Sequence, residues 1–104
     1  MKKALLSAIL GASMTAGIAP QAAAEADYIL ATASTGGTYY PVGVAISTLT
    51  KVKLQPKQKI GMSAINSAGS GENLRLIRER EADFAILQGL YGYYGYQGVG
   101  PVEK

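Results

Sequence analysis

Two glycine-rich loops constrain the fold of this chain, because each follows a strand-like pattern and precedes a helix-like pattern. The first loop spans residues 34–41 and the second spans residues 66–73. Gly36 and Gly37 allow the first loop to turn tightly and to approach a guest molecule closely. The helix that follows each loop offers unpaired N–H groups and the positive end of its dipole to an anion. The loops therefore predict an α/β fold that holds a ligand.

The apolar residues predict three strands, with two helices that connect them. Residues 28–33 form a short apolar run typical of a buried strand, and residues 59–65 and 82–88 are further strand candidates. One helix is expected from residue 38 or 40 to residue 50, and a second is expected to begin at Ser70. This βαβαβ order predicts a parallel sheet with right-handed crossovers.

The spacing of side chains predicts which helix faces are buried. In the first helix, Val42, Ile46 and Leu49 recur on one face and are expected to pack on the sheet. Residues 51–59, which contain four lysines, are expected to form the connection after it.

In the second helix, Leu74 and Ile77 are expected to face inward. Arg75 stands at pairing distance from both Glu72 and Glu79. These acids are therefore interpreted as helix-end and surface charges.

The N-terminus has the pattern of a secretory signal peptide. Lys2 and Lys3 precede the apolar residues 4–19, and Ala22-x-Ala24 supplies the small residues of a cleavage site. Cleavage after Ala24 would leave residues 25–104, enough for one small domain. A retained membrane anchor is the alternative, but the apolar stretch is shorter than the roughly 20 residues that span a bilayer.

Composition and motifs exclude several classes of function. Removal of Lys2 and Lys3 lowers the basic count from 10 to 8 against 7 acids, and no nucleic-acid motif accompanies the lysines of residues 51–59. No lysine follows either glycine loop as a phosphate loop requires, and Leu74 occupies the third glycine position of a dinucleotide fingerprint. The chain has no histidine or cysteine, so the usual zinc ligands and bases are missing. We expect no cofactor, metal or nucleic-acid partner.

Three polar loops converge in the predicted topology. In an open α/β sheet the ligand lies at the carboxyl ends of the strands. Residues 34–40, residues 66–73 and the segment from Gln88 onward all follow predicted strands. Their convergence indicates a binding site more strongly than either glycine loop alone.

Three sequence blocks in order resemble the TAXI family of solute receptors for TRAP transporters. They are residues 35–43 (TGGTYYPVG), 69–76 (GSGENLRL) and 81–88 (EADFAILQ). The resemblance implies a periplasmic receptor with a two-lobed, type II periplasmic-binding-protein-like fold, of which residues 25–104 would be part of the first lobe and the second lobe would be absent. It also implies a small carboxylate or amino-acid ligand such as glutamate, a sodium-driven TRAP permease as partner, and no enzymatic activity.

The residues and the resemblance together give a set of expected ligand contacts. Hydroxyl and backbone groups of the first loop are suited to a carboxylate, and a tyrosine could lie along the carbon chain of the ligand. The expected contacts are Ser34, Thr35, Gly36, Gly37, Thr38, Tyr39, Tyr40, Ser67, Gly69, Ser70, Gly71 and Gln88.

Two positions depart from the pattern of the relatives. Arg80 stands where the relatives usually carry glycine, at a helix end that favours a left-handed residue. The tyrosine-rich residues 89–98 follow Gln88, and Tyr91 and Tyr94 are expected to pack a short helix on the sheet, with Gly92 and Gly95 loosening that helix. Lining the cleft and docking on the permease are the alternatives for these tyrosines.

Two other functional hypotheses stay open at the level of sequence. One is a truncated, non-functional secreted fragment with an unpaired sheet edge. The other is a small secreted enzyme for an anionic substrate, with serines and Lys59 as its plausible catalysts.

The signal-peptide interpretation predicts the N-terminus of the exported protein. N-terminal sequencing of protein recovered after export should begin at Glu25. Exported protein that begins at Met1 would contradict the predicted cleavage.

Overall fold

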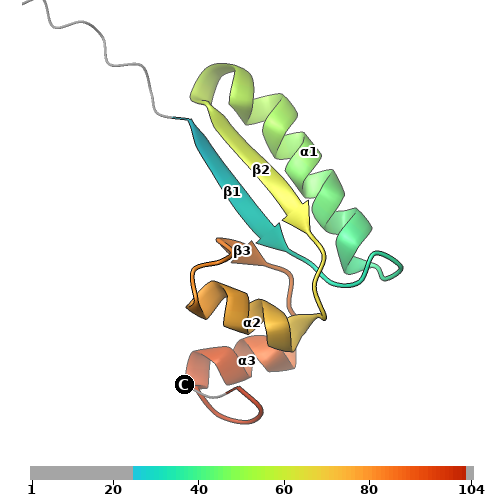
Figure 1. The fold of residues 1–104 in the computed structure, drawn as a ribbon, viewed down its shortest axis with the longest axis vertical. Coiled ribbons are helices and arrows are strands. Elements are labelled where there is room, and N and C mark those ends of the chain that lie inside the picture. Colours follow the sequence, from blue (N-terminus) through green and yellow to red (C-terminus); the bar gives the residue numbers. More distant parts are fainter. Residues whose placement is uncertain (1–24, 103–104) are drawn as a thin grey trace, which may run out of the picture.

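The computed structural model describes residues 25–102 and confirms the predicted α/β fold (Figure 1). The predicted signal peptide lies outside the described residues. The elements, in order, are β1 (Ala26–Ala31), α1 (Tyr39–Gln58), β2 (Ile60–Ile65), α2 (Ser70–Arg78), β3 (Phe84–Ala85) and α3 (Gly89–Gln97).

The described strands form one parallel sheet in the order β2-β1-β3. β1 pairs with β2 over its full length, from Ala26 opposite Ile60 to Ala31 opposite Ile65. The pairing of β1 with β3 is limited to two positions, which begin with Leu30 opposite Phe84. The third strand is therefore shorter than the predicted residues 82–88. Its approach is fixed by Asp83, whose carboxylate accepts a hydrogen bond of 2.8 Å from the backbone N–H of Ile29.

The two faces of the sheet carry different helices. On one face, Ala31 forms a small core with Leu76 of α2 and with Ala82. On the other face, α1 lies along β1 and β2, and its Gly43 approaches Leu30 and Ala64 (Figure 1). Neighbouring strands β1 and β2 thus lead into helices on opposite faces, which opens a crevice beyond their carboxyl ends.

The predicted end of α1 is wrong. Residues 51–58 continue the helix instead of forming a connection, since most of them are good helix formers. Pro56 lies in the last turn, and Lys59 ends the helix in a left-handed conformation with φ of 57°.

The predicted inward face of α1 is also wrong. Val42, Ile46 and Leu49 are 44–60% exposed, whereas Gly43 and Ser47 are buried against the strands. The cause is a close approach of helix and sheet. A Cβ atom at Gly43 would lie 2.3 Å from Cγ2 of Thr32, so only glycine fits between them. The buried face is therefore displaced by one residue from the face that the large aliphatic residues predict.

The second helix differs from the prediction at its start and on its inward face. Gly69 is the N-cap residue, with φ of 109°, and Ser70 is the first helical residue instead of the cap. Leu76 is the residue that enters the core, while Ile77 is 37% exposed. Leu74 faces α3, where a Cβ atom at Gly95 would lie 2.7 Å from its Cδ2 atom. The helix buries two sides because it lies between the sheet and α3.

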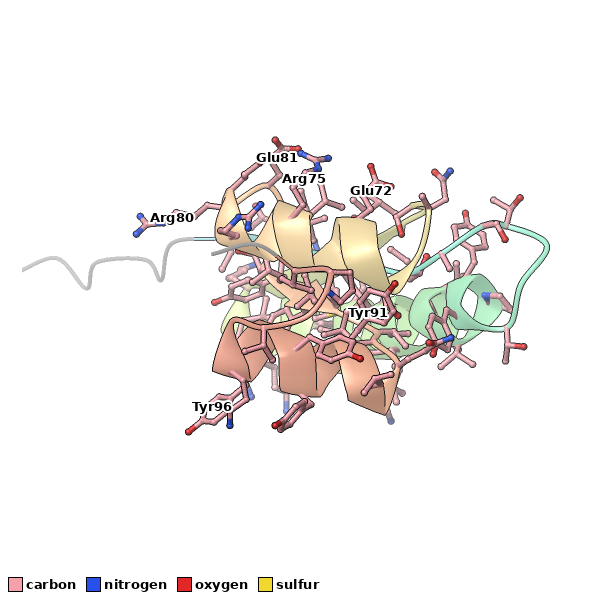
Figure 2. The ribbon with its side chains drawn as sticks, turned by 90° about the horizontal axis from the view of Figure 1, so that it is seen from below. Glu72, Arg75, Arg80, Glu81, Tyr91 and Tyr96 are labelled. Carbon is pink, nitrogen blue, oxygen red and sulfur yellow. The ribbon has the colours of Figure 1, made fainter. Side chains whose placement is uncertain are left out.

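The last described helix packs on α2 and not on the sheet, contrary to the prediction. Tyr91 of α3 lies next to Gly71 of α2, and the rings of Tyr91 and Tyr94 meet edge to face at 6.1 Å. Gly95 serves this contact by leaving room for Leu74. Tyr93 and Tyr96 are exposed, and Tyr96 points away from the helix pair (Figure 2).

The predicted left-handed position is confirmed. Arg80 has φ of 61°, a conformation that costs a side-chain-bearing residue about 1 kcal/mol. Part of the stability of the α2–β3 turn is therefore lost to backbone strain.

The close approach at Gly43 predicts a specific sensitivity to added volume. The Gly43→Ala change forces a methyl group against Thr32, whose hydroxyl is held to the Ile65 carbonyl at 2.6 Å. We expect a loss of about 1–3 kcal/mol in unfolding free energy, measured by urea denaturation of the full chain. Gly92→Ala is the matched control, because nothing lies within 4 Å of its Cβ position and alanine favours a helix. Equal stability of the two variants would contradict the packing described for α1.

Candidate ligand site

A hollow of about 330 Å³ lies at the carboxyl ends of the parallel strands. It is bounded by the segments that follow β1, β2 and β3 and by the first turns of the three helices. Its lining residues are Ala33, Tyr39, Ala68, Gly69, Ser70, Gly71, Gln88 and Tyr91. This is the position that the topology of an open α/β sheet favours for a ligand.

Two other hollows of comparable size lie away from the strand ends. One, of about 260 Å³, runs between α1 and the outer edge of β2 and includes Val44 and Met62. The other, of about 250 Å³, lies beside α2 and includes Arg75 and Pro101. The three predicted loops converge on neither of them, so the strand-end hollow is the candidate site.

Five of the expected contact residues line the hollow. They are Tyr39, Gly69, Ser70, Gly71 and Gln88. The other expected contacts are not among its lining residues. They are Ser34, Thr35, Gly36, Gly37, Thr38, Tyr40 and Ser67.

The first loop turns back on itself through a hydrogen bond of 3.0 Å from the Gly37 N–H to the Ser34 carbonyl. Ser34, Thr35, Gly36 and Thr38 are exposed at this turn. Ligand contact by these residues stays a prediction.

Three lining residues, Ala33, Ala68 and Tyr91, are not among the expected contacts, although lining of the cleft is one alternative for the tyrosines and Ala68 lies inside the second loop. Ala33 and Ala68 have no polar side chain and contribute their backbone. Tyr91 lies one helical turn after Gln88, and this spacing was the available signal for its place beside the site.

Ser70 has a different role from the predicted helix cap. Its side-chain oxygen accepts a hydrogen bond of 2.9 Å from the backbone N–H of Gln88. Ser70 is buried, with 9% of its surface exposed. The bond therefore joins the start of α2 to the start of α3, between two residues that line the hollow.

A buried polar cluster supports the loops from below. The side-chain amide of Asn73 donates to the carbonyls of Thr32 at 2.6 Å and Ile86 at 2.9 Å. The Ser67 hydroxyl lies 2.6 Å from the Oδ1 atom of Asn73 and accepts from the Gly69 N–H at 3.0 Å. Asn73 and Thr32 have no exposed surface. The end of each strand is thus tied to its neighbours by side chains.

The lining of the hollow carries no carboxylate, lysine or arginine side chain. Charged side chains gather instead on the outer side of α2, where Arg75 pairs with Glu79, with Glu72 at 3.3 Å and with Glu81 at 3.8 Å (Figure 2). The predicted pairs of Arg75 with Glu72 and Glu79 are confirmed. Because Arg75 is paired with these acids, the positive feature that faces the hollow is the set of N–H groups at the N-terminus of α2.

Glu72 fixes the loop in front of α2. Its Oε2 atom accepts a hydrogen bond of 2.6 Å from the Ala68 N–H. This bond lowers the pKa of the Glu72 carboxyl; partial desolvation opposes the shift, and Arg75 adds to it. The carboxylate is therefore held in its charged form beside the helix start, where a negative charge is favourable.

The described residues offer no assembled metal site. Residues 25–102 contain no group of three or more acidic, histidine or cysteine side chains placed to hold a metal ion. Within the same range, no helix is long and apolar enough to cross a membrane.

The comparison with known protein families matches most of this structure. The model of the NMT1-like family matches residues 30–104, which include every lining residue of the hollow. The chain belongs to the NMT1-like family. This is a family of periplasmic solute-binding proteins, so the coarse part of the sequence interpretation is confirmed. A search of curated proteins found no match to the sequence.

The family and the positions of two serines bear on the enzyme hypothesis. The NMT1-like family is a family of binding proteins. Lys59 lies just before the first residue of β2, whereas Ser67 and Ser70 follow its last residue. A six-residue strand separates Lys59 from these two serines by about 20 Å, so Ser67 and Ser70 lie at the opposite end of β2 from Lys59.

Proposed function

We propose that this protein captures a small carboxylate or amino acid, such as glutamate, for uptake by a TRAP-type permease. One observation carries the proposal: a neutral hollow at the strand ends faces the N-terminus of α2. A carboxylate binds most favourably where N–H donors and the positive end of a helix are close together and the lining contains no other carboxylate.

The residues around the hollow suggest how a carboxylate would be held. Ser70 and Gly71 stand in the first turn of α2, where backbone N–H groups have no partner within the helix. Tyr39 lies across the hollow at the start of α1, and its phenol is a hydrogen-bond donor. The ring of Tyr91 offers an apolar surface to the carbon chain of the ligand.

The family and the resemblance support the transport role. Members of the NMT1-like family are periplasmic solute-binding proteins, and the three TAXI-like blocks contain the residues that line the hollow from α1, from the start of α2 and from the segment between β3 and α3. We propose a periplasmic location after cleavage at Ala24, and permease subunits as the partner that receives the solute.

A second lobe would complete the site in this proposal. The hollow is partly open to solvent, and Phe84 of β3 is 48% exposed. Ligand sites that bind tightly bury most of the ligand surface, and lobe closure provides that burial. Residues 25–104 would then form part of the first lobe, and affinity would depend on how the open side is covered.

The proposal predicts stabilisation of the protein by carboxylates. L-Glutamate, in a panel with other amino acids and dicarboxylates, should raise the thermal midpoint of the full chain, since a ligand at 100 times its Kd adds about 2.7 kcal/mol. Neutral sugars serve as the negative control. A panel in which no acid or amino acid shifts the midpoint would overturn the proposal.

Two tyrosine variants test whether binding occurs in the strand-end hollow. Tyr39→Phe removes the phenolic hydroxyl at the hollow and keeps the ring. It should weaken L-glutamate binding about tenfold or more, the usual loss for a hydrogen bond to a charged group. Tyr96→Phe makes the same change at a side chain that is 88% exposed, and should leave the calorimetric Kd unchanged. Equal effects of the two variants would place the ligand elsewhere.

A further inference from the structure

We infer that Asn73 is the positioning residue of the candidate site: its side-chain amide sets the relative positions of the three loops that surround the ligand. The inference rests on the proposed function for its ligand, but the loop positions can be measured without one. Asn73 does not line the hollow and has no exposed surface, so it acts through other residues.

The donor side of the amide joins two strand ends. Its two N–H groups bond to the carbonyls of Thr32, directly after β1, and Ile86, directly after β3. β1 and β3 pair at only two positions, and the backbone adds one bond on each side of them, from the Asp83 N–H to the Ile29 carbonyl and from the Ile86 N–H to the Ala31 carbonyl, both at 3.0 Å. The side chain therefore replaces ladder bonds that the short strand does not make. This places Gln88, two residues after Ile86, at the edge of the hollow.

The acceptor side of the amide reaches the loop after β2. The Oδ1 atom of Asn73 lies 2.6 Å from the Ser67 hydroxyl, which in turn holds the Gly69 N–H. Gly69 has φ of 109°, a conformation that favours glycine, and it is followed by the N–H groups at the start of α2. Asn73 thus fixes the turn that directs these donors toward the hollow.

Only an amide of this length satisfies all three contacts. The amide offers two donors to the two carbonyl oxygens and one acceptor to the Ser67 hydroxyl, a combination that asparagine and glutamine alone provide. The Ser67 hydroxyl also lies 3.2 Å from the Thr32 carbonyl, so the three groups form one cluster. Glutamine is one methylene longer and does not fit a fully buried position without displacing its neighbours. A carboxylate would retain the acceptor but face the two carbonyls without a donor.

The Asn73→Asp change tests the inference on the full chain. Amide hydrogen exchange, followed by NMR without ligand, should become about tenfold faster or more at Ile86, Gln88 and Gly69, because the change removes both donors of the amide and the loss of even one net hydrogen bond of ordinary strength has an effect of about that size. Exchange in β1, β2 and α1 should stay unchanged. The Kd for L-glutamate, the probe ligand, should rise by about tenfold as well.

Two further variants make the test decisive. Ser47→Ala is the matched control, because Ser47 is also a buried polar residue, in α1, and its hydroxyl has no hydrogen-bond partner in the described structure. It should alter neither loop exchange nor affinity. Asn73→Ser, which introduces no buried charge, replaces Asn73→Asp if the carboxylate prevents folding, and should give the same local pattern.

The outcomes separate this inference from the proposed function. Unchanged exchange at the three loop amides would overturn the positioning role, and so would uniform acceleration throughout the chain or loss of folding in both Asn73 variants. Failure of the wild-type chain to bind L-glutamate or any other acid would overturn the proposed function. The exchange measurement would still decide the role of Asn73 in that case.

Discussion

The hydrogen bonds of the Asn73 amide are the interaction on which the candidate site depends. A parallel sheet brings the ends of its strands to one edge, but it does not fix the loops that follow them. Here one buried side chain contacts the ends of β1 and β3 and the loop after β2. The apolar core is small, with Ala31, Leu76 and Ala82 at its centre, so polar contacts carry much of the order at this edge. A lost contact in such a cluster leaves a buried polar group unpaired, which costs about 1–3 kcal/mol.

Two features make the strand-end hollow suitable for an anion. Its lining has no acid, and the ion pairs of Arg75 keep the acids of α2 on the outer side of the helix. Glu72 satisfies the Ala68 N–H in front of α2, while the donors of the first turn face the hollow. These features agree with membership of a family of periplasmic solute-binding proteins.

Local sequence signals predicted the architecture but not its packing. The apolar runs and glycine loops predicted the parallel α/β order, because local patterns decide where strands and helices form. The left-handed conformation of Arg80 was expected from the glycine that the relatives usually carry at this helix end. The inward face of α1 was predicted wrongly, since the approach of Gly43 to Thr32 depends on residues far apart in the chain. The sequence predicted Gln88, Ser70 and Tyr39 near one edge of the sheet. It did not predict the buried contacts of Asn73, because these also join residues far apart in the chain. The partner of α3 was missed because tyrosine spacing indicates a packed face without indicating what it packs against.

The position of the bound ligand tests the central claim most directly. A crystal structure of the full chain grown with L-glutamate should show the ligand carboxylate at the first turn of α2, beside Gly71, with Tyr39 and Gln88 within contact distance. Ligand bound instead in the groove between α1 and the outer edge of β2, beside Met62, would contradict the account.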